Sequence, residues 1–145
     1  MSYWDTSALS KLYLPEPDSA VFAQRAAVDP AIVTTKLALY EMRRVAFRKE
    51  SEGFIQAGTA ESVLAQVNQD VTTGQIRVVE MDARVEAEFN VTIATCYRRT
   101  PPLPIRTLDA LHLASARADN QIEVVAADKR MRDAAKLLGL TLFPV

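Results

Sequence analysis

Four acidic residues stand out among the 18 of the chain, because each lies beside apolar residues where a strand is expected to end or a helix to begin. Asp5 follows a short apolar segment at the start of the sequence, and Asp128 follows an apolar run late in it. Asp109 falls in the first turn of an otherwise apolar helical segment, and Glu41 falls in the second turn of a long one. The other acids are expected to cap helices or to lie on polar helix faces.

The position of these acids at strand ends and helix starts predicts a shared site. In a parallel α/β sheet, ligands bind beyond the carboxyl ends of the strands, where such residues would meet. Converging carboxylates repel one another, so the cluster is stable only if it binds a cation or holds protons. With one His and one Cys in the chain, a zinc site of the usual His/Cys type is excluded. Oxygen ligands alone favour a hard divalent ion such as Mg²⁺ or Mn²⁺.

Each of the four acids also has a purely structural alternative. Asp5 and Asp128 precede predicted helices, so either could serve only as an ordinary N-cap. The dipole of its own helix could stabilise Asp109 without any ligand. Glu41 has arginines three and seven residues further along the same helix face, and a surface ion pair with one of them would also account for it.

Short apolar segments alternate with helical patterns along nearly the whole chain. Strands are predicted at residues 2–4, 31–34, 76–81, 122–126 and 141–143. Helices are predicted at residues 7–14, 18–28, 35–52, 59–74, 82–97, 107–119 and 128–138, with caps expected at Asp18, Thr35, Asp82 and Thr107. Strands separated by helical crossovers predict a parallel sheet of about five short strands with helices on both faces. No repeat or linker divides the sequence, so residues 1–145 are expected to form one α/β domain.

Composition narrows the classes of function. The net charge of −1 gives no overall basic signal of a nucleic-acid-binding protein. The four glycines are scattered, which excludes a glycine-rich phosphate-binding loop. A single Cys excludes an intramolecular disulfide and suits a reducing compartment. The sequence shows neither a signal peptide at its start nor an apolar run near the roughly 18 residues of a membrane span, so we expect a cytoplasmic location and no membrane partner.

Four segments, taken in order, resemble the PIN-domain ribonucleases, and most closely the VapC-type toxins of bacterial toxin–antitoxin pairs. The first is Tyr-Trp-Asp-Thr-Ser-Ala-Leu at residues 3–9, with the helix that follows it. The others are Leu-Ala-Leu-Tyr-Glu-Met at 37–42, Thr-Leu-Asp-Ala-Leu-His-Leu-Ala at 107–114 and Ala-Asp-Lys-Arg-Met at 127–131. One departure is Ala126, which stands where the family often has Thr or Ser two residues before its fourth acid.

The resemblance implies a metal-dependent enzyme that hydrolyses RNA phosphodiester bonds, with all four acids in the catalytic site. Mg²⁺, or Mn²⁺, held by Asp5, Asp109 and Asp128 would stabilise charge on the phosphate and lower the pKa of an attacking water. Glu41 would bind a second ion, or orient or deprotonate that water.

The same resemblance implies supporting residues and partners. The hydroxyls of Thr6 and Ser7 would hydrogen-bond the acids or contact the substrate. The expected partners are the RNA substrate, a cognate antitoxin protein that blocks the site, and a second copy of the chain in a homodimer. We expect an interface on the first two predicted helices, because they carry more apolar residues than a thin cover layer needs. These residues are Leu9, Leu12, Tyr13, Val21 and Phe22.

Basic residues near the acidic segments predict contacts with the RNA backbone. Without the four acids, the chain has 17 basic and 14 acidic residues. Positive charge of this kind could guide phosphates past the metal site. The alternative is a solvated helix face with no such role. The candidates are Arg44, Arg48, Arg106, Lys129 and Arg130.

His112, Tyr3 and Trp4 are expected to have structural roles. His112 shares a helix face with Asp109, but a packed or hydrogen-bonded position is favoured over a role as general base. Tyr3 and Trp4 are expected to pack in the core rather than stack on bases.

Two other functions remain open at this point. One is a small phosphatase of the haloacid dehalogenase type, with Asp5 as a covalent nucleophile. That family has a second acid where this chain has Ser7, and Thr or Val where it has Leu9, so the fit is poor. The other is a catalytically inert PIN-like domain that serves as a binding or scaffold module. The phosphatase and the nuclease would both need metal, but only the nuclease would cleave single-stranded RNA, and absence of both cleavage and metal binding would favour the scaffold module.

Overall fold

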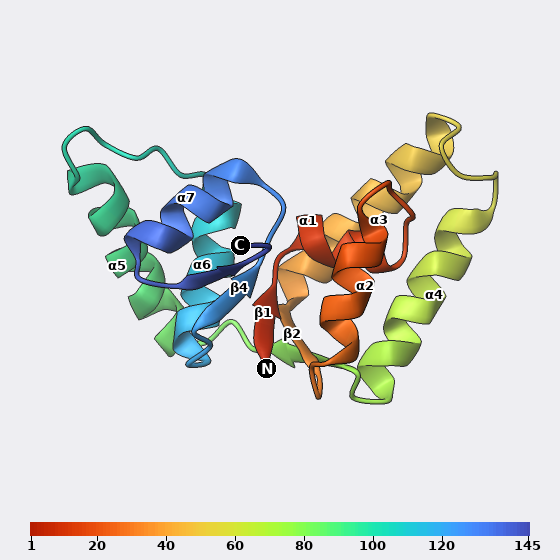
Figure 1. Ribbon diagram of the computed structural model, residues 1–145, viewed down its shortest axis with the longest axis horizontal. Helices are drawn as coiled ribbons and strands as arrows, with labels where there is room; N and C mark the ends of the chain where they lie inside the picture. Colours follow the sequence, from red (N-terminus) through yellow and green to blue (C-terminus); the bar gives the residue numbers. More distant parts are fainter.

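The central sheet has five parallel strands in the order β3-β2-β1-β4-β5. The computed structural model, drawn in Figure 1, describes residues 1–145. Because the first strand of the chain lies at the centre of the sheet, its carboxyl end is flanked by segments from both halves of the sequence. The predicted α/β class and parallel sheet are confirmed. The strands are β1 Ser2–Trp4, β2 Ile32–Thr35, β3 Ile76–Val79, β4 Glu123–Val125 and β5 Thr141–Phe143.

Helices connect the strands and cover both faces of the sheet (Figure 1). They are α1 Thr6–Leu9, the short 3-10 helix η1 Ser10–Leu12, α2 Ser19–Ala27, α3 Lys36–Ser51, α4 Thr59–Thr72, α5 Ala83–Arg98, α6 Thr107–Ala118 and α7 Lys129–Leu137. The prediction of a continuous helix at residues 7–14 is wrong beyond Leu9. There the chain tightens, because the amides of Tyr13 and Leu14 both donate to the carbonyl of Ser10.

Adjacent residues of each central strand enter different hydrophobic cores. Tyr3 packs in the core under α5, α6 and α7, whereas Trp4 packs in the core under α1 to α4. Val124 and Val125 of β4 divide in the same way. This alternation follows from the pleat of a strand, which directs successive side chains to opposite faces. Tyr3 and Trp4 are both fully buried, so the prediction that they pack in the core is confirmed.

Helix starts agree with the sequence only in part. Asp82 caps α5 as predicted, accepting hydrogen bonds from two amides of the first turn. The prediction of a cap at Thr107 is wrong, since Arg106 occupies the N-cap position and Thr107 is already helical. Asp18 precedes α2, but its side chain makes no capping hydrogen bond there. It instead accepts a 2.8 Å hydrogen bond from Lys11 Nζ, because that ammonium offers a stronger, charged donor.

The apolar residues expected to form an interface are mostly used inside the protein. Leu9 and Phe22 are buried, and Leu12 and Tyr13 pack against the same core. Only Val21, which is 45% exposed, faces solvent to a large extent. The argument for an interface on these helices was therefore wrong, and homodimer formation stays a prediction without a surface assigned to it. No helix of the chain is long and apolar enough to cross a bilayer.

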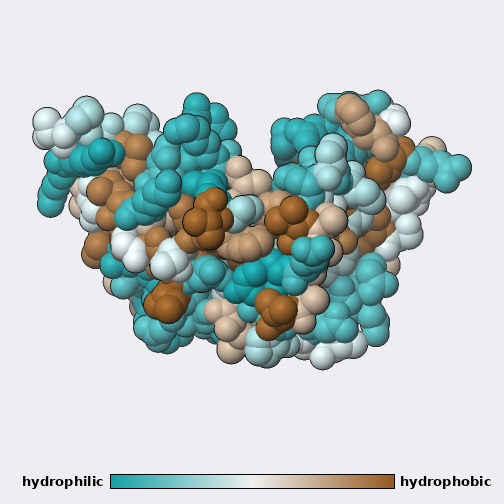
Figure 2. All heavy atoms as spheres, viewed as in Figure 1, coloured by the Kyte–Doolittle hydropathy of each residue, from teal (hydrophilic) through white to brown (hydrophobic).

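The parallel arrangement brings the carboxyl ends of all strands to one edge of the sheet. β1 ends there directly before Asp5, and β4 ends there three residues before Asp128. α3 begins at the end of β2 and carries Glu41 on its second turn, while α6 carries Asp109 on its first. In Figure 2, the molecular outline is hollowed at this edge, between a lobe that contains α5 to α7 and a lobe that contains α3 and α4.

Candidate active site at the carboxyl edge of the sheet

An open pocket with a volume of about 520 Å³ lies at this edge. Its lining comes from the turn after β1, from α3, from the start of α6 and from the turn between β4 and α7, and almost all of it is polar. The structure therefore brings together residues that are more than 100 positions apart in the sequence. Among the lining residues are all four acids singled out above, Asp5, Glu41, Asp109 and Asp128.

Asp5 is a buried carboxylate with no cationic group hydrogen-bonded to it. Its side chain caps α1, accepting a 2.9 Å hydrogen bond from the amide of Ala8, and it accepts a further hydrogen bond from Ser7 Oγ. The residue is only 3% exposed. Burial raises the pKa of Asp5 to about 6, against the lowering effects of His112 and of both hydrogen bonds. Capping and placement in the pocket therefore coexist at this residue.

The hydroxyl of Ser7 joins the turn after β1 to the turn after β4. Besides contacting both carboxylate oxygens of Asp5 at 2.7 and 2.8 Å, Ser7 Oγ accepts hydrogen bonds from the amides of Ala127 and Asp128. The carboxylate of Asp128 in turn accepts a 3.0 Å hydrogen bond from the amide of Met131 and caps α7. Ala126 has no hydroxyl to offer at this point of the chain, so Ser7 and the helix start together hold Asp128 in place.

Glu41 is held through one of its two oxygens. Oε1 accepts a 2.8 Å hydrogen bond from Thr6 Oγ1 and lies 2.7 Å from His112 Nε2. Burial acts to raise the pKa of Glu41, but the hydrogen bonds and charge of these partners outweigh it, and the pKa is lowered. Glu41 forms its ion pair with His112 and not with Arg44 or Arg48, so that structural alternative is wrong, although the nearby charge of Arg44 also helps to lower the pKa of Glu41.

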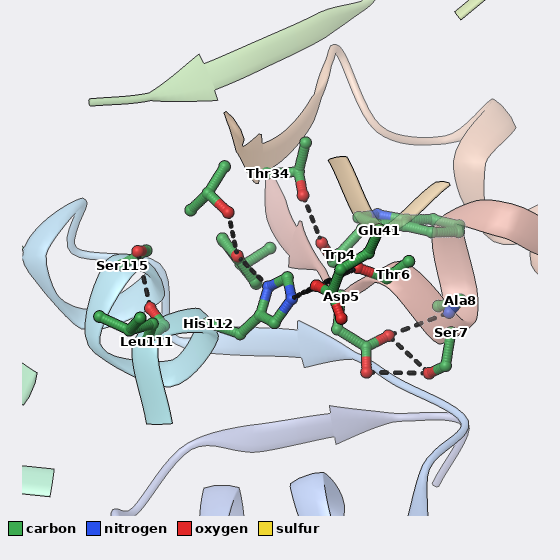
Figure 3. A network of polar contacts seen from close by, with 12 residues as sticks. Trp4, Asp5, Thr6, Ser7, Ala8, Thr34, Glu41, Leu111, His112 and Ser115 are labelled. Atoms are coloured by element: carbon green, nitrogen blue, oxygen red, sulfur yellow. Dashed lines mark hydrogen bonds and ion pairs between the residues drawn. The ribbon is translucent and has the colours of Figure 1, made fainter. Parts of the chain in front are cut away.

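His112 lies on the floor of the pocket and is 1% exposed. Its two ring nitrogens face different partners, since Nδ1 lies 2.6 Å from Tyr3 Oη. Nε2 is directed at Glu41, as Figure 3 shows. The predicted hydrogen-bonded position of His112 is confirmed. Thr35, expected to cap α3, makes no side-chain capping bond, because its hydroxyl faces Tyr3 Oη at 3.4 Å.

Asp109 completes the set of acids from the first turn of α6. It is half-buried and accepts no hydrogen bond from the protein. Burial is the main cause that raises the pKa of Asp109, and the neighbouring charges of Asp128 and Glu41 raise it further. This carboxylate is therefore held close to other negative charges without a compensating donor.

These observations fit a hard divalent cation in the pocket. The donors are carboxylate oxygens, and both Asp5 and Asp109 have raised pKa values that a nearby cation would lower. No three His, Cys, Asp or Glu side chains form a ready-made metal-binding group in the structure. The residues present thus have the right chemistry for Mg²⁺ or Mn²⁺, although their side chains do not already surround one point.

Of the five basic residues expected to contact RNA, only Arg48 lines this pocket. Arg106 and Arg130 line a separate pocket of about 320 Å³, and Lys129 pairs with Asp133 at 2.8 Å. Arg44 is exposed on α3 outside the lining. Helical rotation separates residues that are neighbours in the sequence, which is why the predicted group does not form one surface.

The pocket is also lined by two lysines that are not among these five residues, Lys11 and Lys49. Lys11 lies at its rim, where it forms ion pairs with Glu16 at 3.1 Å and with Asp18 at 2.8 Å. Lys49 lies beside Arg48 on the last turns of α3. In the sequence, the only indication that Lys11 lines the site is its place shortly after the first acidic segment. Its distance from the other three acids depends on the fold.

Comparison with known proteins places the chain in a family. The PIN domain family matches residues 2–137. Ribonuclease VapC46 of Mycobacterium tuberculosis (strain ATCC 25618 / H37Rv) is 30% identical to it over 142 residues, which cover 97% of this chain and 94% of that protein.

Two crystal structures share the fold. One is VapBC2 from Rickettsia felis bound to a DNA fragment from its promoter, with a TM-score of 0.67 and 16% identity over 98% of this chain and 97% of that chain. The other is FitAcB from Neisseria gonorrhoeae, with a TM-score of 0.64 and 17% identity over 99% and 96% of the two chains. At these identities the likeness is one of fold alone. The family match along almost the whole chain, on a fold that gathers four acids at one sheet edge, shows that the protein belongs to the PIN domain family.

Proposed function

We propose that the protein is a metal-dependent endoribonuclease that hydrolyses RNA phosphodiester bonds and acts as the toxin of a toxin–antitoxin pair. The observation that carries this proposal is the pocket that gathers four carboxylates, in which neither Asp5 nor Asp109 forms a salt bridge. The 30% identity to a ribonuclease along nearly the full chain supports the same activity.

Asp5, Asp109 and Asp128 are the residues that would hold Mg²⁺ or Mn²⁺ in this proposal. When bound, the ion supplies charge stabilisation at the scissile phosphate and lowers the pKa of the attacking water. Asp5 and Asp128 are fixed by helix-capping hydrogen bonds and by Ser7, so their carboxylates need little reorganisation. Asp109 has no such hydrogen bond, and its carboxylate is free to turn toward a cation.

Glu41 acts on the water in the same proposal. Its Oε1 is occupied by Thr6 and His112, whereas Oε2 accepts no hydrogen bond from the protein. The lowered pKa of Glu41 keeps the side chain ionised at neutral pH, so Oε2 is available to accept a hydrogen bond from the attacking water and to orient it. This role needs a carboxylate whose position is fixed relative to the other acids.

The substrate would enter along the open side of the pocket, past Arg48 and Lys49. Both belong to the last turns of α3, the helix that also carries Glu41. The side chains of all three residues line the pocket. Cationic side chains at this rim offset the repulsion between the carboxylates and an RNA phosphate. Arg44, Arg106, Lys129 and Arg130 lie outside the lining and would contact only more distant phosphates.

The proposed protein partner is a cognate antitoxin, with cytoplasmic RNA as the substrate of the free toxin. The two structures that share the fold are of VapBC2 and FitAcB, and the sequence resembles the VapC-type toxins. Homodimer formation is part of the same proposal and is tested by the mass of the purified protein in solution.

The decisive experiment measures cleavage of single-stranded RNA by purified protein in Mg²⁺ and in EDTA, beside an Asp5→Asn variant. We expect cleavage by the wild-type protein in Mg²⁺ alone. Release of phosphate from a monoester substrate without RNA cleavage would instead favour the phosphatase, and absence of both cleavage and metal binding would favour the scaffold module. Growth arrest on expression, relieved by the same substitution, tests the toxin role.

A further inference from the structure

A chain of hydrogen bonds leads from the centre of the sheet to the acidic pocket. Tyr3 Oη lies 2.6 Å from His112 Nδ1, and His112 Nε2 lies 2.7 Å from Glu41 Oε1. Tyr3 is 0% exposed and His112 is 1% exposed, whereas the Glu41 side chain is 31% exposed. The chain therefore has one end in the core, at Tyr3, and the other at the open pocket, at Glu41.

The three residues come from three elements whose relative positions the site must keep fixed. Tyr3 belongs to β1, His112 to α6 and Glu41 to α3. His112 lies three residues after Asp109 on the same helix, so it shares a helix face with that acid. A contact that fixes Glu41 against His112 thus also fixes Glu41 relative to Asp109.

The partners define which nitrogen of His112 carries the proton. Glu41 is ionised and can only accept, so the hydrogen between the two side chains belongs to Nε2. When the ring carries only that proton, Nδ1 is the acceptor of the 2.6 Å contact with the Tyr3 hydroxyl. Both ring nitrogens are engaged within the protein, which leaves no lone pair for a water in the pocket.

The same contacts divide the two oxygens of Glu41. Oε1 accepts from both Thr6 and His112, while Oε2 has no protein donor. With His112 removed, Thr6 alone would hold the carboxylate, and the side chain would rotate among several rotamers. A carboxylate that orients water loses effectiveness when its position spreads in this way.

We propose that Tyr3 and His112 form a buried strut that fixes the Glu41 carboxylate, which makes His112 a positioning residue of the site. The word strut here means the hydrogen-bonded pair of Tyr3 and His112, and Glu41 is the residue whose carboxylate it holds in position. The positioning role rests on the proposed ribonuclease function, whereas the protonation pattern of the strut can be measured without it.

The first test reads the strut directly by NMR. His112 is the only histidine of the chain, so ¹⁵N signals from its imidazole need no assignment by mutation. We expect the wild-type ring to carry its proton on Nε2, with Nδ1 as an acceptor. Tyr3→Phe removes only the buried Oη, and it should move the Nδ1 resonance downfield toward that of a free acceptor. Ser115→Ala is the matched control, because Ser115 is buried on the same helix and bonds to the carbonyl of Leu111, outside the strut.

The second test reads positioning through kinetics. His112→Ala should lower kcat by roughly 10- to 100-fold with little change in KM for RNA, as expected when a partner of a catalytic group is lost. His112→Gln should restore part of kcat, since its amide nitrogen reaches the place of Nε2. His112→Asn should not, since its amide reaches only the place of Nδ1. A merely structural loss would not separate Gln from Asn in this way.

Several outcomes would contradict the proposal that the strut positions Glu41. They are a wild-type ring protonated on Nδ1, a Tyr3→Phe spectrum identical to wild type, and wild-type kcat in His112→Ala. If His112→Ala does not fold, as judged by circular dichroism, the comparison of the Gln variant with the Asn variant still decides the question. A wild-type protein that shows the expected tautomer but cleaves no RNA would contradict the proposed function and leave the strut itself supported.

Discussion

Two buried aspartates, Asp29 and Asp5, lie at opposite edges of the same sheet and have very different surroundings. The side chain of Asp29, at the amino edge, is 5% exposed and forms a 3.0 Å ion pair with Arg25. It also accepts a 2.5 Å hydrogen bond from Ser2 Oγ. Asp5, at the carboxyl edge, is 3% exposed and receives hydrogen bonds only from Ser7 and the amide of Ala8.

The difference separates a structural acid from one available to a ligand. Burying a carboxylate is costly unless a cation or several donors compensate it. At the amino edge, Arg25 supplies that compensation to Asp29 and also pairs with Glu123 at the start of β4. At the carboxyl edge, the charge of Asp5 is left for something outside the chain to neutralise. Burial alone therefore does not separate the two acids, whereas the presence of a salt bridge at Asp29 and its absence at Asp5 does.

The largest expected effect is on the rate of RNA cleavage, when Asp5 and Asp29 are each replaced by asparagine in separate variants. Asp5→Asn should lower kcat for RNA cleavage at least on the order of a hundredfold, since about 3 kcal/mol of transition-state stabilisation would be lost with the metal ligand. Asp29→Asn should leave kcat within about twofold, because Asp29 lies outside the pocket. Steady-state kinetics on one RNA substrate measures both. An equal loss in the two variants would remove the distinction drawn between the edges.

The second effect is on the free energy of unfolding, and it concerns Arg25 at the amino edge of the sheet. Arg25→Met keeps the apolar stem but leaves Asp29 and Glu123 without their cation. We expect the free energy of unfolding to fall by about 3 kcal/mol, since breaking a buried pair leaves uncompensated charge. Denaturant unfolding measures this loss, and kcat per folded molecule should not change. Unchanged stability would show that the amino edge needs no cation.

The third effect is a pH dependence of stability that belongs to Asp5. Its pKa is about 6 in the folded protein against an ordinary value of 3.8, so the folded state binds the proton more tightly than the unfolded state. The contribution of this proton to the free energy of unfolding is fully present below pH 3.8 and is lost as the pH rises through about 6. In EDTA, Asp5→Asn should therefore be more stable than wild type by about 2–3 kcal/mol at pH 7.5, with the difference vanishing near pH 4. Equal unfolding free energies of the two proteins at pH 7.5 would mean that burial does not penalise the Asp5 charge.

The smallest effect is the stabilisation that a cation should confer. At pH 7.5, Mg²⁺ at ten times its dissociation constant should stabilise the wild-type protein by about 1.4 kcal/mol and raise Tm by roughly 4 °C. Asp29→Asn should show the same rise, whereas Asp5→Asn and Asp109→Asn should show little. Thermal melts with and without the metal provide the measurement. A rise in Asp5→Asn as large as in wild type would place the cation elsewhere.

The sequence predicted the frame of this site well, because its signals are local. Strand β5 at residues 141–143 follows from an apolar segment between turn residues, and its bounds are those predicted. The placement of Asp5 and Asp128 at one edge follows from parallel strands alone, which must end on the same side. These inferences need only the periodicity of the chain and the rule for parallel crossovers.

The details that involve contacts between elements were not predictable. The contact between His112 and Glu41 depends on how α6 and α3 are rotated about their axes, which neither segment encodes by itself. The same limit applies to Arg106 and Arg130, which lie within three residues of Asp109 and Asp128 in the sequence but line another pocket. A helical residue one position from an acid points about 100° away from it, so closeness in sequence is a weak guide to closeness at a site.

The hydrogen bonds of Ser7 have a consequence for protein synthesis. Ser7 contacts Asp5, and it also contacts the amides of Ala127 and Asp128, which are made more than 100 residues later. β1 likewise needs β4 as its neighbour in the sheet. A nascent chain on the ribosome therefore lacks a complete pocket until residue 128 has left the exit tunnel. A chain with the proposed ribonuclease activity would be inert toward its own messenger and the ribosome until that segment has emerged and β4 has paired with β1.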